Sequence, residues 1–406
     1  MPSTIPDPLN VPLIGGRRQA VADFISLYPR MKDEFFRFAI FGDSQETNPG
    51  GAGRGFIEHL NIEANDRFGQ APETPIHRAS GSTGGSTPAI FLSRNQQSSG
   101  GSNVAGDFTL PNLTGRAGGS NGILQMLLPT AELISYGGGR RKYFDEQTGT
   151  LIYRAFMYTD SAGPAEIEVR EMHHTVSQPN YFIGTDQIHT SVGLNLNGSD
   201  QEVKVYDTPF LTFDPARPYF QMRMRNSPKV IGGRFVDIDA RQQGATFDSF
   251  SAGGYSTDDF LRNHSNAGPT LSALGPYEVI FILTGANDEN FSEAVRKGHQ
   301  RNLIEALRGP SWLNNPNQKI CLVSDDYFAG HSGPARENFR QFARYDNEIA
   351  NEYDNTVSLN MGRRTYEKGF VDIWDNISDS VHISSEPHKV AKAQYFMDTW
   401  KDANVA

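Results

Sequence analysis

Apolar residues follow two different patterns along this chain. Toward the two ends they form short, nearly continuous runs, which are FRFAIFGDS (36–44), ATFDSFS (245–251), YEVIFILTG (277–285), KICLVS (319–324) and TVSLNM (356–361). Runs of this length and density are typical of strands that are buried on both faces of a parallel sheet. We therefore expect each run to form a central strand.

Stretches with helical spacing of apolar residues lie between and beyond these runs. They cover residues 55–68, 290–307, 335–353 and 388–400. Strands that alternate with helices indicate a parallel sheet covered by helices on both faces. The two ends of the chain thus predict an α/β fold.

The middle of the chain has a different pattern. Short alternating segments such as TLIYRAFMYT, AEIEVREM, QEVKVYD and RFVDID are separated by Asp, Gly, Asn and Pro, which is typical of an all-β sandwich. We expect a jelly-roll-like module at residues 130–245, inserted into a discontinuous α/β domain of residues 1–129 and 246–406. The Gly- and Ser-rich segment 79–122 has too few large apolar residues for a core. It is either an irregular surface excursion or a loop that shapes a cleft.

Composition and charge narrow the choice of function. The chain has 406 residues, which favours two domains, and no apolar run approaches the ~18 residues of a membrane span. A formal net charge of −10 argues against a nucleic-acid partner, because phosphates bind to basic surfaces. The single cysteine, Cys321, cannot form an internal disulfide and is expected in the core. The first residues lack the pattern of a signal peptide.

A candidate nucleophile follows the first apolar run. Gly42-Asp43-Ser44 lies where a buried strand would turn toward a helix. This is the carboxyl edge of a parallel sheet, where open α/β folds bind their ligands. A serine hydroxyl at this place needs a base before it can act as a nucleophile.

A candidate base lies near the other end of the chain. Asp379 precedes His382 by three residues, just before the last predicted helix. A carboxylate at this spacing can hold the imidazole Nδ1–H and stabilise the imidazolium that forms when serine loses its proton. His388 is a rival, but it follows Pro387 and has no aspartate at the same spacing.

Two further blocks can supply hydrogen-bond donors. Asn287 follows the strand-like run at 277–285, where a side-chain amide can donate to a developing oxyanion. Gly253-Gly254 follows the run at 245–251, and glycine at such a turn lets a backbone N–H face a ligand. Taken singly, each block is also typical of an ordinary turn or helix cap.

The four blocks together, in this order, resemble the SGNH (GDSL-like) hydrolase family. They are Gly-Asp-Ser at 42–44, the glycine block at 253–254, Gly-Ala-Asn-Asp at 285–288 and Asp-Ser-Val-His at 379–382. The resemblance implies a three-layer α/β/α, flavodoxin-like fold. It also implies that the discontinuous α/β domain is catalytic and hydrolyses an ester through a covalent acyl-enzyme.

The resemblance also assigns roles to residues. Ser44 is the expected nucleophile, His382 the general base and then acid, and Asp379 the carboxylate that orients the histidine. The backbone N–H groups of Ser44 and Gly254 and the side chain of Asn287 form the expected oxyanion hole. Such a mechanism needs no cofactor and no metal, and no His or Cys spacing in the chain resembles a zinc site.

The sequence departs from the family pattern in two places. Gln45 follows the serine where leucine is more usual, and about 200 residues separate the first block from the glycine block. A β module between these blocks is similar to the arrangement in bacterial SGNH esterases that deacetylate polysaccharides or peptidoglycan. An ester substrate, more specifically an acylated glycan, is therefore the expected partner. A polysaccharide substrate would favour a secreted or periplasmic location.

Alternative substrates and functions remain open at this point. Aromatic residues of the module could stack on sugar rings or form the sandwich core; they are Tyr153, Tyr158, Tyr181 and Tyr219. The same catalytic fold could act on a lipid, an aryl ester or a thioester. A non-catalytic glycan-binding or structural protein is a third reading, although an intact set of four blocks argues against it. Asp237 and Asp239 fit an exposed, alternating strand face rather than a metal site.

Overall fold

The computed structural model describes part of the chain, and the structural statements below concern those residues. They are residues 10–43, 56–78, 101–104, 115–118, 124–129, 150–158, 163–172, 187–196, 203–207, 211–212, 219–225, 229–265, 267–285, 287–324, 334–367 and 386–402.

A six-stranded, mainly parallel sheet forms the centre of the α/β part. Its strands, in spatial order, are β1 (Ile14–Gly16), β17 (Thr356–Asn360), β16 (Lys319–Ser324), β15 (Val279–Leu283), β2 (Phe35–Gly42) and β14 (Gly244–Ser249). Five of these strands are parallel, and β1 pairs antiparallel with β17 at one edge. Counted along the chain, the parallel strands have the order 2-1-3-4-5, which is that of flavodoxin-like folds. The predicted parallel sheet is confirmed.

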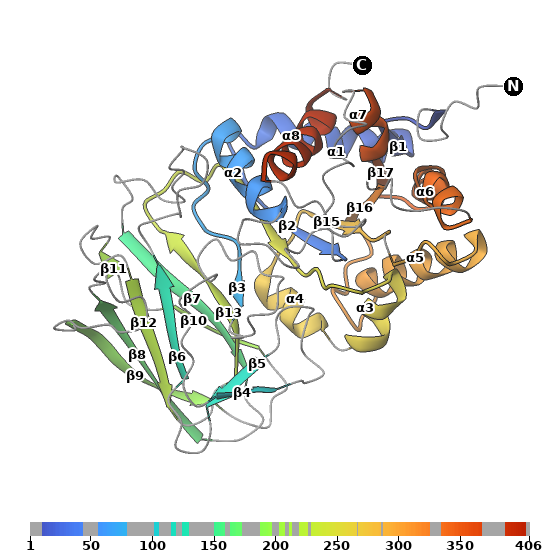
Figure 1. Ribbon diagram of the computed structural model, residues 1–406. Coiled ribbons are helices and arrows are strands. Elements are labelled where there is room, and N and C mark those ends of the chain that lie inside the picture. The colour runs from blue at the N-terminus through green and yellow to red at the C-terminus, as the bar shows by residue number, and fades with distance from the viewer. Residues whose placement is uncertain are drawn as a thin grey trace, which may run out of the picture.

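Helices cover both faces of this sheet. One face carries α1 (Arg18–Arg30), α2 (Phe56–Phe68), α7 (Met361–Glu367) and α8 (Glu386–Asp402), and the other carries α3 (Thr257–Asn263), α4 (Gly268–Leu274), α5 (Glu293–Arg308) and α6 (Pro334–Ala350). Figure 1 shows α1, α2 and α8 above the sheet and α3, α4 and α5 below it. The expected three-layer α/β/α arrangement is therefore present.

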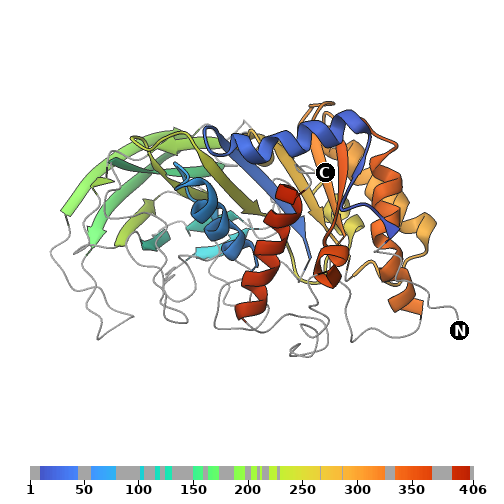
Figure 2. The same cartoon turned by 90° about the horizontal axis from the view of Figure 1, so that it is seen from above.

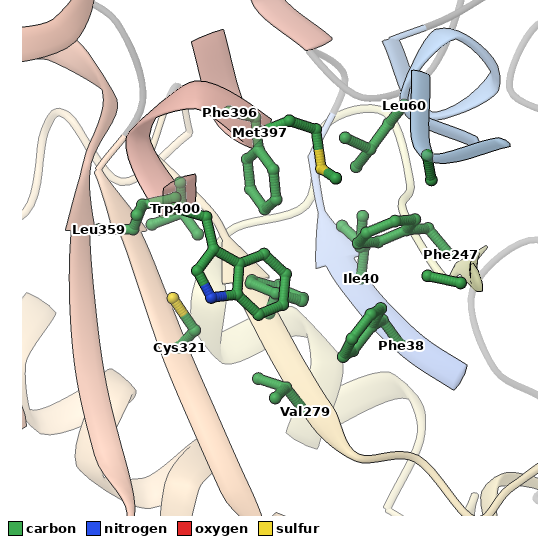
Figure 3. Close-up of a cluster of buried hydrophobic side chains, with 14 of the residues drawn as sticks. Phe38, Ile40, Leu60, Phe247, Val279, Cys321, Leu359, Phe396, Met397 and Trp400 are labelled. Atoms are coloured by element: carbon green, nitrogen blue, oxygen red, sulfur yellow. The ribbon is translucent and has the colours of Figure 1, made fainter. Parts of the chain in front are cut away.

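The larger core lies under the last helix. The Trp400 indole stacks on Phe24 with ring centroids 4.5 Å apart, and its N–H donates to the Phe24 carbonyl at 2.9 Å. The same indole meets the edge of Phe38 in β2 at 5.4 Å. Figure 3 shows Trp400 in the middle of the cluster, together with the buried thiol of Cys321. Burial raises the pKa of this thiol well above its usual value, so Cys321 is a core residue as expected.

Antiparallel sheets occupy the segment between α2 and β14. The larger sheet consists of β3 (His77–Arg78), β4 (Gly101–Val104), β5 (Gly115–Gly118), β7 (Thr150–Tyr158), β10 (Lys204–Asp207), β11 (Leu211–Thr212) and β13 (Lys229–Asp237), and the smaller one of β6 (Leu124–Pro129), β8 (Gly163–Met172), β9 (Gln187–Leu196) and β12 (Tyr219–Arg225). Figures 1 and 2 both show these sheets beside the α/β part. Whether they form a jelly-roll-like module stays a prediction.

The antiparallel strands begin earlier in the chain than the expected boundary at residue 130. Strands β3 to β6 all precede it. Two of them, β4 and β5, lie in the Gly- and Ser-rich segment 79–122, which we expected to be either an irregular surface excursion or a loop that shapes a cleft. Their sequences, GSNV and GRAG, contribute backbone pairing rather than large apolar side chains. The segment therefore extends a sheet without needing a core of its own.

A buried charged cluster joins the larger antiparallel sheet to the parallel sheet. Arg234 of β13, only 1% exposed, pairs with Glu73 and with Asp248 of β14, the latter at 2.8 Å. Arg37 of β2 binds the same Glu73, with Nη2 2.8 Å from Oε2. Tyr277 donates its hydroxyl to Asp248 at 2.7 Å, and burial beside this carboxylate raises the pKa of the phenol, which keeps the proton in place. These contacts hold the two parts of the molecule together.

Candidate active site

Three strands end side by side at the carboxyl edge of the parallel sheet. In the paired register, Leu283 of β15 lies opposite Gly42 of β2, and Ser249 of β14 lies opposite Ile40. The chain after β14 stays close to β2, because the Ala252 N–H donates to the Gly42 carbonyl at 3.0 Å. Strand β2, the first parallel strand along the chain, lies between β14, the second, and β15, the third. This is the point where the connections change direction and open α/β folds bind ligands.

Asp43 connects the end of β2 with the loop that carries Asn287. Its side chain is buried, at 1% exposure, and Oδ2 accepts the Gly285 N–H at 3.0 Å. Residue 44 follows directly in the chain. Ser44 itself lies outside the described residues, as do Asp379 and His382. Their assigned roles therefore stay predictions.

Gly254 lies in a tight turn after β14. Its φ is +80°, a conformation that L side chains rarely adopt, and the Tyr255 N–H closes the turn on the Ala252 carbonyl at 3.3 Å. Among the described residues, no atom lies within 4 Å of the position that a Cβ on Gly254 would take. The residue is exposed. The described residues thus leave open the space beside the Gly254 Cα.

Asn287 reaches across from the β15 loop to the Gly254 turn. Its Nδ2 donates to the Tyr255 carbonyl at 3.0 Å. A primary amide carries two N–H donors, so this bond orients the amide plane and occupies only one of them. The structure therefore brings together the two oxyanion candidates that it describes, Gly254 and Asn287.

Helix α8 begins at the same edge of the sheet. Gly69 follows the last residue of α2, and a Cβ on Gly244 would lie 2.9 Å from the Gly69 carbonyl oxygen. Because Gly244 is the first residue of β14, α2 ends at the amino edge of the parallel sheet. The first residue of α2, Phe56, consequently lies toward the carboxyl edge, and Lys392 of α8 places its Nζ 4.9 Å from the centre of the Phe56 ring. Glu386, the first residue of α8, therefore lies toward this edge too, four residues after His382.

Three further expectations from the sequence can be compared with the structure. Tyr153 is 1% exposed and packs on Phe235, so it is a core residue and not a sugar-stacking one. Asp237 is 4% exposed rather than on an open strand face, and its backbone N–H donates to the Pro72 carbonyl at 2.7 Å. Asp239 lies in a turn, and its N–H donates to the Asp237 carboxylate at 3.0 Å.

The described residues also bear on metal binding and membrane insertion. They contain no group of three or more His, Cys, Asp or Glu side chains that could hold a metal ion. None of the helices in the same residues combines the length and the apolar character that crossing a bilayer would require.

Sequence reasoning missed the buried polar residues behind the two oxyanion candidates. Asp288, Thr257 and Arg296 are each 0% exposed, and Asp288 accepts hydrogen bonds from both of the others. The only signal was the position of Asp288 in the Gly-Ala-Asn-Asp block, where an aspartate beside an asparagine is also typical of a turn. Arg296 belongs to the helical stretch 290–307, which suggests no buried ion pair, and no element was expected at Thr257.

Comparison with known proteins supports the fold. No protein-family model and no curated protein matches the chain. Among solved structures, a peptidoglycan O-acetylesterase is similar, with a TM-score of 0.60 and 14% identity over 97% of this chain and 100% of the other. At this identity the likeness shows the fold alone. Together with the strand order, it shows the SGNH/GDSL hydrolase fold that the sequence motifs imply.

Two other solved structures are less similar. One is a GDSL-like lipase from Parabacteroides merdae, with a TM-score of 0.30 and 18% identity over 39% of this chain and 74% of that one. The other is a family two carbohydrate esterase from Clostridium thermocellum, with a TM-score of 0.25 and 9% identity over 71% and 93% of the two chains. These scores are too low to carry an argument about this chain.

Proposed function

We propose that this chain is a serine esterase that hydrolyses short-acyl, specifically O-acetyl, esters of carbohydrates. One observation carries the proposal: the loops after β2, β14 and β15 meet at the switch point of an SGNH/GDSL hydrolase fold. The Asp43–Gly285 and Asn287–Tyr255 hydrogen bonds tie these loops together. Ser44 directly follows this meeting point in the chain.

The proposed mechanism begins with Ser44 Oγ attacking the ester carbonyl. His382 takes the hydroxyl proton and returns it to the leaving alcohol, while Asp379 holds the histidine in the required tautomer. The backbone N–H groups of Ser44 and Gly254 and the second N–H of Asn287 donate to the oxyanion of the tetrahedral intermediate. Water then hydrolyses the acyl-enzyme with the same histidine as base.

The substrate class rests on two supports. The fold is shared, over nearly the whole of both chains, with a peptidoglycan O-acetylesterase. The chain also carries large antiparallel sheets beside the catalytic sheet, which offer surface for a polymeric substrate (Figure 1). Acetylated glycans are therefore the first substrates to test, with peptidoglycan beside xylan and pectin.

The test compares p-nitrophenyl esters of increasing chain length, alongside acetylated xylan, pectin and peptidoglycan. Activity should fall steeply from acetyl to longer chains, since a small pocket rejects each added methylene by about 1–3 kcal/mol. Rising activity through octanoyl esters would move the assignment to a lipid or aryl-ester esterase. Binding of glycans without any hydrolysis would favour the non-catalytic alternative.

Ser44→Ala is the decisive variant for the nucleophile. It should abolish ester hydrolysis down to the residual catalysis of binding and the oxyanion hole, on the order of 10³-fold over water. Ser26→Ala is the matched control, because Ser26 is an exposed serine on α1. Full activity in the Ser44→Ala protein would refute the assignment.

A further inference from the structure

A buried carboxylate lies behind the two loops of the proposed oxyanion hole. Asp288, which follows Asn287 in the chain, is 0% exposed. Its Oδ1 accepts the Thr257 N–H at 2.9 Å, and its Oδ2 accepts the Thr257 hydroxyl at 2.5 Å. Thr257 begins α3, three residues after Gly254. The Asp288 carboxylate thus connects the loop that carries Asn287 to the start of α3, which follows the Gly254 turn.

The contact with Asp288 also fixes which way the hydrogen bond between Thr257 and Thr284 points. Thr257 Oγ1 also lies 2.5 Å from Thr284 Oγ1, and either atom could donate in isolation. The Thr257 hydroxyl donates to Asp288 Oδ2, so its single proton points to that oxygen. Thr284 at the end of β15 must then donate to Thr257. The hydrogen bonds from Thr284 to Thr257 and from Thr257 to Asp288 thus leave the Thr257 hydroxyl only one orientation.

Arg296 of α5 binds the same carboxylate, at the oxygen that also accepts the Thr257 hydroxyl. Its Nη1 lies 2.9 Å from Asp288 Oδ2 and its Nη2 lies 3.1 Å from Asp346 Oδ1 in α6. The guanidinium carbon is 3.6 Å from the centre of the Phe342 ring. Ser324 at the end of β16 donates to Asp346 at 3.0 Å. The two ion pairs of Arg296 thus connect the loop after β15 with α5 and α6.

The position of an oxyanion donor matters within about half an ångström. A buried, hydrogen-bonded charge has one low-energy arrangement, because any displacement leaves a polar group unsatisfied in the interior. The surface bond from Asn287 to the Tyr255 carbonyl is less constrained, since Asn287 is only half-buried. The rigid link between the two loops is therefore the one through Asp288.

We propose that Asp288 is a positioning residue of the oxyanion hole, which holds the Asn287 and Gly254 loops at a fixed separation through Thr257. It does not touch the substrate. The inference rests on the proposed function, because the loops it holds are those assigned to the oxyanion.

The first experiment is Asp288→Asn in the full chain. Asparagine has the same shape but only one acceptor oxygen. Its NH2 group faces the Thr257 N–H if it takes the place of Oδ1, and faces the Thr257 hydroxyl and Arg296 if it takes the place of Oδ2. We expect kcat on p-nitrophenyl acetate to fall by about 10- to 100-fold with KM within about threefold, since the donors act mainly in the transition state. Glu73→Gln is the matched control, a buried carboxylate bound to arginines outside these loops. A kcat less than about tenfold below that of the control would overturn the proposal.

A milder pair of variants tests the same contact if Asp288→Asn does not fold. Thr257→Ser keeps the hydroxyl, and Thr257→Val keeps the shape without it. We expect Thr257→Ser to retain kcat within about threefold and Thr257→Val to lose about tenfold at unchanged KM. Equal kcat values for the two variants, measured well below both melting temperatures, would contradict a positioning role.

Hydrogen–deuterium exchange separates this inference from the proposed function. Amides of residues 252–258 should exchange faster in Asp288→Asn than in Glu73→Gln, whether or not the protein hydrolyses esters. Absence of hydrolysis in the wild-type chain would refute the proposed function alone. Unchanged exchange over residues 252–258 would refute the positioning role alone.

Discussion

Replacing Arg234 by methionine should strongly destabilise the protein. Methionine fills most of the volume but leaves Asp248, which is 0% exposed, without its buried cation. Breaking a buried ion pair in this way costs about 3–5 kcal/mol. Asp248 keeps hydrogen bonds from the Ile76 N–H at 2.8 Å and the Tyr277 hydroxyl at 2.7 Å, and Glu73 keeps Arg37. We therefore expect a loss near the lower limit, about 3 kcal/mol.

The expected loss can be measured by urea denaturation and calorimetry. For a chain of 406 residues it corresponds to a fall in Tm of about 3–4 °C. Since Arg234 links the two kinds of sheet, we also expect them to unfold less cooperatively than in the wild-type protein. Arg262→Met is the matched control: Arg262 pairs with Asp259 at the surface with its side chain 65% exposed, so it should cost below about 1 kcal/mol.

A double variant tests the reasoning itself. If the cost comes from an unpaired buried charge, adding Asp248→Asn to Arg234→Met should restore part of the stability, because no unpaired aspartate remains. A loss below about 1 kcal/mol for Arg234→Met alone would mean that desolvation already cancels the attraction of the pair. No recovery in the double variant would place the cost in packing instead of charge.

Three further predictions follow from individual contacts. Burial by itself raises the pKa of Glu73, but Arg234 and Arg37 outweigh it and hold the pKa below the ordinary 4.5. The stability that the ionised group contributes is therefore present above pH 4.5 and is lost on acidification below it. Calorimetry from pH 3 to 6 should show a shallower loss of stability in Glu73→Gln than in the wild-type protein. Trp400→Ala should cost about 3–5 kcal/mol in urea denaturation, and a loss below about 1 kcal/mol would contradict its place in the core. Asn287→Ala should lower kcat by roughly 10²–10³ with little change in KM, whereas a change in KM alone would mean ground-state binding.

The sequence predicted the parallel strands well because each is a dense apolar run buried on both faces. The run at 319–324 coincides with β16, and the stretch at 290–307 differs from α5 by a few residues at its ends. Helix α1 was missed although Phe24, Leu27 and Tyr28 have helical spacing. Strand β1 could not be predicted, since three residues with two glycines carry no pattern and exist as a strand only by pairing with β17.

The buried charges could not be predicted, because burial of a charge depends on partners far away in the chain. Arg234 lies in RFVDID, an alternating pattern in which every second residue suggests an exposed face. Its burial arises because Glu73 and Asp248 lie on either side of it after folding, 161 and 14 residues away in the chain. The same holds for Arg296 and Asp346, which are 50 residues apart on two helices. Spacing rules describe one element at a time and miss such pairs.

The place of the antiparallel sheets in the chain explains how the fold carries them without disturbing its candidate site. The chain leaves α2 at Gly69 and returns at Gly244, and the two backbones approach so closely that a Cβ on Gly244 would lie 2.9 Å from the Gly69 carbonyl oxygen. Gly244 pairs with Phe35 at the amino edge of the sheet, whereas the loops with Gly254 and Asn287 lie at the carboxyl edge. Because the two ends of this segment meet, the parallel sheet can close around it. The length of the segment between Gly69 and Gly244 therefore need not alter the separation of the strand ends that carry the proposed chemistry.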